Sequence, residues 1–139
     1  MELNYFQLSL MSFLKESHPE KLNNIDFIAE RADAAAAEYE QAIRNGNNDV
    51  TAAELANIVL FSGLNFSKHD TIKNILWREF ANEIPEEDAT DLAIKLLPEL
   101  EAIFNKYTIS DGFAYEPEFE ILYTELTGLI ALMIKSRNF

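Results

Sequence analysis

GLNFSKHDTIKNILWREF, residues 63–80, contains the most completely specified helix start in the sequence. Ser67 is followed three residues later by Asp70, a variant of the capping box in which the hydroxyl accepts from the third helical N–H and the carboxylate reaches back to the cap. The pattern predicts a helix that begins at Lys68. Behind this start, apolar residues recur at helical spacing and predict one buried face. These residues are Ile72, Ile75, Leu76 and Phe80.

The same stretch holds the single Trp of the chain and one of its two His residues. Trp77 lies beside the apolar stripe, where we expect its indole N–H to find a partner at the edge of the core. His69 precedes Asp70, but adjacent helix residues point about 100° apart, and Asp70 already serves the cap. His69 and Trp77 form a candidate pocket, although aromatic residues at this spacing more often belong to a core.

Length and composition predict a single helical domain over residues 1–139. A chain of this size buries roughly two-thirds of the surface that it exposes when unfolded. Cysteine is absent, which excludes disulfides and thiolate zinc sites and fits a reducing compartment. The N-terminus lacks the basic segment of a signal peptide, and the longest uncharged stretch, residues 126–134, is far short of the roughly 20 residues of a membrane span. We therefore expect a cytoplasmic protein with no membrane partner.

Three helices are predicted upstream of the opening stretch, over residues 3–17, 26–44 and 52–61. The first ends at His18, because the residue before a proline is pushed out of the helical region. We expect His18 to be a solvated residue at this helix end. The third helix opens with a capping box in which Thr51 is the cap.

Downstream, Pro85 suits the first turn of a helix, and Pro98 either kinks that helix or separates two. Residues 107–115 read as a loop. The last helix begins at Pro117 and has so little polar surface that we expect other helices to enclose it. Gly128 costs this helix about 1 kcal/mol relative to alanine, so we expect a crossing helix to pack there. The pattern predicts an all-α fold, an irregular orthogonal array of six to seven helices.

Charge is unevenly distributed along the chain. The whole sequence has a net charge of −13, and residues 79–134 contain thirteen acidic and two basic residues, a net of −11. A net charge of this sign opposes direct binding to nucleic acid, since phosphates are neutralised by Lys and Arg. Spaced carboxylates can instead attract a basic protein. The candidate interaction surface consists of Glu83, Glu86, Glu87, Asp88 and Asp91.

Motifs for catalysis and cofactor binding are missing from the sequence. It contains neither the glycine-rich phosphate-binding motifs nor G-x-S-x-G nor H-E-x-x-H. Neither His is preceded three residues earlier by Glu, as a di-iron helical bundle would require. We therefore predict no catalytic residue, no metal site and no cofactor.

Four segments of the chain carry a resemblance to a known family. They are LNYFQLSLMSFLKESHPE, ERADAAAAEYEQAIRNG, GLNFSKHDTIKNILWREFANEIPEEDA and YEPEFEILYTELTG. Together they resemble the small proteins grouped as domain of unknown function 1896, from anaerobic Bacteroides-like bacteria. The resemblance covers nearly the whole chain and implies a single cytoplasmic bacterial domain. It implies no activity, cofactor or site residue.

Three functions from different classes fit these observations. The first is a protein–protein interaction or regulatory module without catalytic activity. The second is an acidic decoy that resembles DNA and binds a DNA-handling protein. The third is an enzyme that uses His69 with nearby carboxylates, for which the spacing is unfavourable. The partner is an unidentified protein, for which a basic surface would suit the acidic segment, and self-association is also open.

Overall fold

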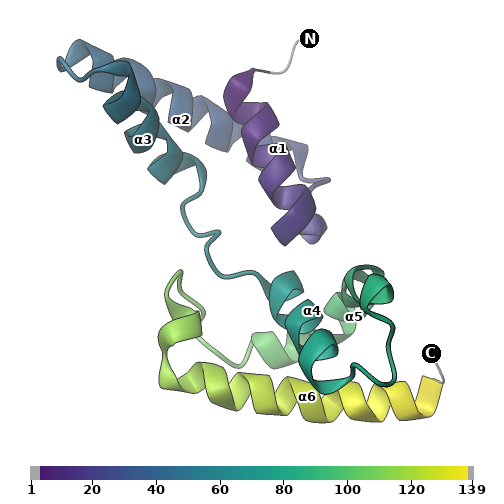
Figure 1. Cartoon of the computed structure of the whole chain (residues 1–139). Coiled ribbons are helices and arrows are strands. Elements are labelled where there is room, and N and C mark those ends of the chain that lie inside the picture. Colours follow the sequence, from purple (N-terminus) through teal and green to yellow (C-terminus); the bar gives the residue numbers. More distant parts are fainter. Residues whose placement is uncertain (1–3, 138–139) are drawn as a thin grey trace. The chain divides into compact units, whose positions relative to one another are not determined.

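The computed structural model describes residues 4–137, which form six α-helices (Figure 1). No strand occurs in this range, so the predicted all-α class and the number of helices are confirmed. Three single 3₁₀ turns lie between the helices: η1 (Pro19–Lys21), η2 (Glu86–Asp88) and η3 (Phe113–Tyr115). The helices are α1 (Tyr5–Ser17), α2 (Ile25–Arg44), α3 (Asp49–Leu60), α4 (Lys68–Glu79), α5 (Ala89–Phe104) and α6 (Pro117–Arg137).

The chain divides into two compact units, Met1–Asn65 and Phe66–Phe139. The first contains α1, α2 and α3, with α2 packed against both other helices. Alanines fill much of its interior, and their small side chains let the helix backbones approach closely. The buried alanines are Ala32, Ala35, Ala42, Ala52 and Ala56. That residues 1–139 form a single domain stays a prediction.

The second unit is built from α4, α5 and α6. The predicted apolar stripe of α4 faces its core, where Ile72, Ile75 and Leu76 are at most 1% exposed. Aromatic rings extend this core beyond the helices: Phe66 meets Phe113 edge to face, with ring centroids 5.3 Å apart. Such pairs contribute beyond the area they bury. The core of the second unit is therefore continuous from α4 to α6.

Side-chain caps mark the starts of α1, α2, α3 and α4, and two of these caps bear on predictions from the sequence. The Ser67 hydroxyl accepts from the backbone N–H of Asp70 at 2.9 Å, which confirms the predicted start of α4. The predicted cap of α3 was wrong. Asn48, rather than Thr51, caps this helix, and the backbone N–H of Thr51 donates to the Asn48 Oδ1 at 2.8 Å. Because the capping asparagine lies three residues upstream of Thr51, α3 begins earlier than predicted, at Asp49.

Pro98 lies within one continuous helix, α5, and does not separate two. Pro98 is exposed, and Ile94, whose carbonyl loses its helical partner, is 45% exposed. Water can satisfy that carbonyl on the solvent side, so the missing N–H does not break the helix. Pro85 precedes the single turn η2, and α5 itself begins four residues later, at Ala89.

His18 is buried at 2% exposure, which contradicts the expectation of a solvated residue. Its Nε2–H donates to the carbonyl oxygen of Leu64 at 2.8 Å, so it joins the end of α1 to the segment after α3. Glu20 lies 3.8 Å from the other ring nitrogen. Burial acts to raise the pKa of Glu20, but hydrogen bonding, first to His18 and then to the backbone N–H of Glu20 itself, lowers that pKa overall.

One face of α6 is buried and the opposite face is exposed. Leu122, Leu126 and Ile130 are fully buried, whereas Ile121 and Leu132 are 59% and 64% exposed. The prediction that other helices enclose α6 was therefore wrong. The prediction of a helix packed at Gly128 was also wrong, because a Cβ atom added there would meet no atom within 4 Å. The apolar composition of α6 is spread over both faces.

Glu125 connects α6 to the chain segment that follows α5. Its carboxylate accepts from the Tyr107 hydroxyl at 2.8 Å and forms an ion pair with Lys106. Hydrogen bonds from Lys106 and then Tyr107 lower the pKa of Glu125. The same carboxylate raises the pKa of Tyr107. The loop after α5 is thus held against α6 by polar side chains.

Ser67→Ala should destabilise the second unit by about 1 kcal/mol, because the N–H of Asp70 loses its acceptor. Unfolding in denaturant, followed by the fluorescence of Trp77, measures the change in the unit that contains both residues. Ser110→Ala is a control that removes an exposed hydroxyl whose hydrogen bond, to the Glu116 carboxylate, is long at 3.4 Å. Equal stability of the Ser67 variant and the wild type would show that this cap does not fix the start of α4.

Leu126→Ala or Ile130→Ala should lower the free energy of unfolding by about 2–5 kcal/mol, since each leaves a cavity in the core. Leu132→Ala is the matched control on the exposed face of the same helix. Its effect should stay within about 0.5 kcal/mol. Similar losses at Leu126 and Leu132 would mean that both faces of α6 are covered.

Glu125→Gln should lower stability at neutral pH and lose its effect in acid. The folded pKa of Glu125 is below its usual value of 4.5, so its ionised form stabilises the fold above that pH. This contribution disappears as the pH falls through the lowered pKa. The measurement is the free energy of unfolding of both proteins between about pH 7 and about pH 3. A difference that does not shrink in acid would contradict this assignment.

Candidate functional site

The predicted interaction surface lies on the connection between α4 and α5 and on the first turn of α5. Phe80 and Ile84 are 8% and 5% exposed, and the N–H of Ile84 donates to the Phe80 carbonyl at 2.8 Å. This buried pair holds the connection against the core of the second unit. The acidic residues between and after the two anchors consequently face solvent. All five predicted residues are exposed: Glu83, Glu86, Glu87, Asp88 and Asp91.

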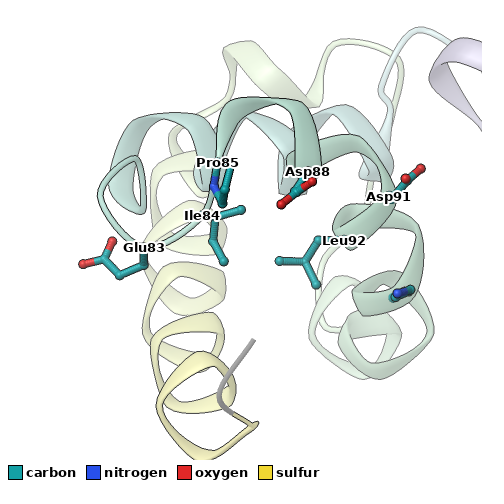
Figure 2. Close-up of a pocket in the computed structure, with 7 residues that line it drawn as sticks. Glu83, Ile84, Pro85, Asp88, Asp91 and Leu92 are labelled. Carbon is teal, nitrogen blue, oxygen red and sulfur yellow. The ribbon is translucent and has the colours of Figure 1, made fainter.

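An open pocket of about 580 Å³ brings three of these five residues together (Figure 2). Ile84 and Leu92 form its apolar part, with Glu83 and Asp91 at opposite ends and Asp88 between them. Pro85 and Lys95 complete its lining. We call this the acidic pocket. It combines an apolar surface with three carboxylates and one ammonium group, a net charge of −2.

A second pocket, of about 410 Å³, lies beside the acidic pocket and shares Ile84 with it. It is also lined by Trp77, Ala81 and Glu86. The Trp77 indole N–H donates to the Glu86 carbonyl oxygen at 3.2 Å, which confirms the prediction of a partner at the edge of the core. The ring is 39% exposed, and Lys73 Nζ lies 5.2 Å from its centroid. Trp77 therefore offers a partly exposed aromatic surface.

The carboxylates of the acidic pocket are available to a partner. Within residues 4–137, none of the five predicted acidic residues makes an ion pair with another side chain. Lys95 likewise forms no ion pair within residues 4–137. It lines the pocket from α5, four residues after Asp91. Unneutralised carboxylates beside an apolar surface suit a ligand that has both a cationic head and an apolar stem.

His69 does not line either pocket. It lies on the first turn of α4 and is 1% exposed, whereas Trp77 is two turns away on the same helix. The structure therefore separates the two residues of the candidate His69–Trp77 pocket. A buried imidazole has no direct path to a substrate in these pockets.

The described residues contain neither a cluster of metal ligands nor a membrane-spanning helix. No three His, Cys, Asp or Glu side chains of residues 4–137 are placed to hold one metal ion. In the same range, each helix is too short or too polar to cross a bilayer.

Four lining residues of the acidic pocket were not predicted from the sequence: Ile84, Pro85, Leu92 and Lys95. Leu92 and Lys95 fall on a helix whose apolar pattern predicts only burial, and Pro85 was read as a helix start. The run of carboxylates around them was the one signal in the sequence that pointed to this segment. It did not show which apolar residues lie beside the carboxylates. The hollow itself depends on how the α4–α5 connection folds over Ile84.

The chain matches a family model and a solved structure over most of its length. No curated protein matches the chain. The chain is similar to a solved structure, the crystal structure of protein PG0816 from Porphyromonas gingivalis, with 41% sequence identity and a TM-score of 0.90. The match covers 95% of this chain and 90% of that one. The family model of the domain of unknown function DUF1896 matches residues 1–139. The chain therefore belongs to the DUF1896 family.

Proposed function

We propose that this protein is a non-catalytic protein–protein interaction module, and that its acidic pocket binds a basic segment of a partner protein in the cytoplasm. The observation that carries the proposal is the placement of Glu83, Asp88 and Asp91 around the apolar surface of Ile84 and Leu92. A pocket with this lining matches Lys and Arg side chains, which have an apolar stem and a charged head.

Each part of the acidic pocket has a separate role in this proposal. Ile84 and Leu92 contact the methylene groups of the bound side chain. Asp88 and Asp91 accept hydrogen bonds from its cationic head, and such charge-assisted bonds are stronger than neutral ones. The regional charge of the chain speeds the encounter, because opposite potentials steer association. Trp77 adds a partly exposed aromatic surface to the neighbouring pocket.

A second candidate function is that of an acidic decoy for a DNA-handling protein. It is favoured by the five exposed carboxylates between residues 83 and 91, which form no ion pairs within residues 4–137. A partner that binds these carboxylates with its phosphate-binding surface would be released from this protein when DNA is added. Competition with a short duplex distinguishes the two functions: a decoy and duplex DNA exclude each other on the partner, whereas a general interaction module does not respond to DNA.

Removing the carboxylates of the acidic pocket should weaken partner binding without unfolding the protein. In the triple variant, Glu83→Gln, Asp88→Asn and Asp91→Asn leave the shape of the pocket nearly unchanged and remove three charges. The immobilised wild type is used to capture partners from a lysate of a related bacterium. Association rates with the main captured protein are then measured from low to physiological salt. We expect the variant to associate at least about tenfold more slowly at low salt, where the Debye length is about 30 Å.

The matched control removes three charges from the first unit. Glu30→Gln, Asp33→Asn and Glu54→Gln change exposed side chains and bring the net charge from −13 to −10, as the pocket variant does. Its association rate should fall by less than about twofold at physiological salt, where the Debye length is about 8 Å and charges that do not contact the partner are screened. Circular dichroism checks the fold of both variants. Equal rates and salt slopes for the two variants would mean that the acidic pocket is not the binding surface.

A further inference from the structure

The exposed face of α6 is a second surface without a partner in its own unit. Counting about 100° of rotation per residue, six exposed residues between positions 121 and 135 fall within about 60° of the direction of Gly128, which is one of them. We call these residues the outer face of α6; all six are exposed. They are Ile121, Thr124, Gly128, Ala131, Leu132 and Lys135.

Gly128 is the most informative residue of this face. A glycine in the middle of a helix makes that helix less stable than an alanine would, because glycine loses more conformational freedom on folding. Nothing within the described chain requires it, since an added Cβ would meet no atom within 4 Å. A glycine at such a position permits another backbone to approach the helix closely. Ile121 and Leu132 flank this point with large apolar side chains that are more than half exposed.

Charge is distributed asymmetrically along α6. Its first turn contains Glu118 and Glu120, and its outer face ends in Lys135, which makes no ion pair with the described part of the chain. A second copy of α6 running in the opposite direction would place each basic end beside an acidic end. A parallel copy would place like charges together, which is unfavourable.

We propose that the outer face of α6 binds the outer face of a second copy of this chain, with the two helices antiparallel and crossing at Gly128. A two-fold axis at Gly128 places Thr124 of each copy opposite Leu132 of the other, since both are four residues from the axis. Lys135 then lies beside Ile121 of the other copy, within one turn of its Glu118 and Glu120. Both ends of the contact thus pair opposite charges.

The contact is small, because one pair of helices provides it. Interfaces that bury less than about 1,200 Å² in total belong to the weak and transient class. The dimer should therefore form and dissociate with concentration, which sedimentation equilibrium measures directly. Its strength should also fall with salt, because the charges at its two ends are exposed.

The charge pairing is tested by exchanging charges between the two ends of α6. Lys135→Glu or Glu120→Lys alone should weaken the dimer by roughly 2- to 30-fold, the range for two exposed ion pairs. The double variant with both substitutions should restore the wild-type dissociation constant. Glu54→Lys in the first unit is the control and should leave the dissociation constant of the dimer unchanged. Failure of the double variant to recover, or a wild type that stays monomeric at about 1 mM, would overturn the proposal.

Cysteine cross-linking tests the direction of the two helices. The chain contains no cysteine, so each introduced thiol is unique. Under mild oxidation, Thr124→Cys and Leu132→Cys proteins should cross-link when mixed, whereas Thr124→Cys alone should not, because its two copies lie about 12 Å apart along the axis. Cross-linking of Thr124→Cys alone would show a parallel pair. The absence of any cross-link would show that this face is not the interface.

A bulky residue at Gly128 distinguishes an effect on dimer formation from an effect on folding stability. Gly128→Gln should weaken association at least about tenfold, because the longer side chain keeps the two backbones apart. Its unfolding midpoint should stay the same or rise, since the new side chain meets no atom of its own chain and glutamine favours helix. A lower midpoint with unchanged association would mean that Gly128 serves the fold instead.

Discussion

Burial of Ile84 is the constraint on which the candidate site depends. This residue follows α4 by five positions, and its side chain is drawn into the core while its backbone N–H returns to Phe80. The chain between them must then turn sharply, which leaves the carboxylates on the outside. Because Ile84 lines both pockets, its position also sets the apolar surface next to those carboxylates. A single apolar contact thus decides what the acidic segment can present to a partner.

The second unit has two surfaces of different chemistry. The acidic pocket combines unpaired carboxylates with a small apolar area and suits a cationic side chain. The outer face of α6 is mainly uncharged and has opposite charges at its ends, so it suits an antiparallel copy of itself. A protein that pairs through one surface could present two acidic pockets at once, and two linked sites bind a repeated partner more tightly than one site does. The two proposals are nevertheless carried by separate residues, so each can fail without the other.

Membership of the DUF1896 family fixes the fold more firmly than the function. The similarity to the Porphyromonas gingivalis structure extends over nearly the full length of both chains at 41% identity. The family is named for its unknown function, and folds host many activities. Function therefore has to be argued from sites. Here the unpaired carboxylates of the acidic pocket, rather than the buried His69, carry that argument.

Local signals in the sequence determined much of the secondary structure. Ser67 accepts the hydrogen bond that its spacing predicts, and the helical period of Ile72, Ile75 and Leu76 identified a buried face. Such features depend on residues within one or two turns of each other. The acidic segment could be found in the same way, because charge is a property of the sequence and charged residues without partners remain at the surface.

Only the tertiary structure decided what lies opposite each residue. His18 looked like a solvated helix end, but its partner is the carbonyl of Leu64, 46 residues away. Gly128 looked like a packing site within the chain, and the structure shows open space beside it. The acidic pocket required Ile84 to fold beneath a connection and Leu92 to approach it from α5. Local patterns specify whether a side chain is apolar or charged, whereas its neighbours depend on contacts between segments that are distant along the chain.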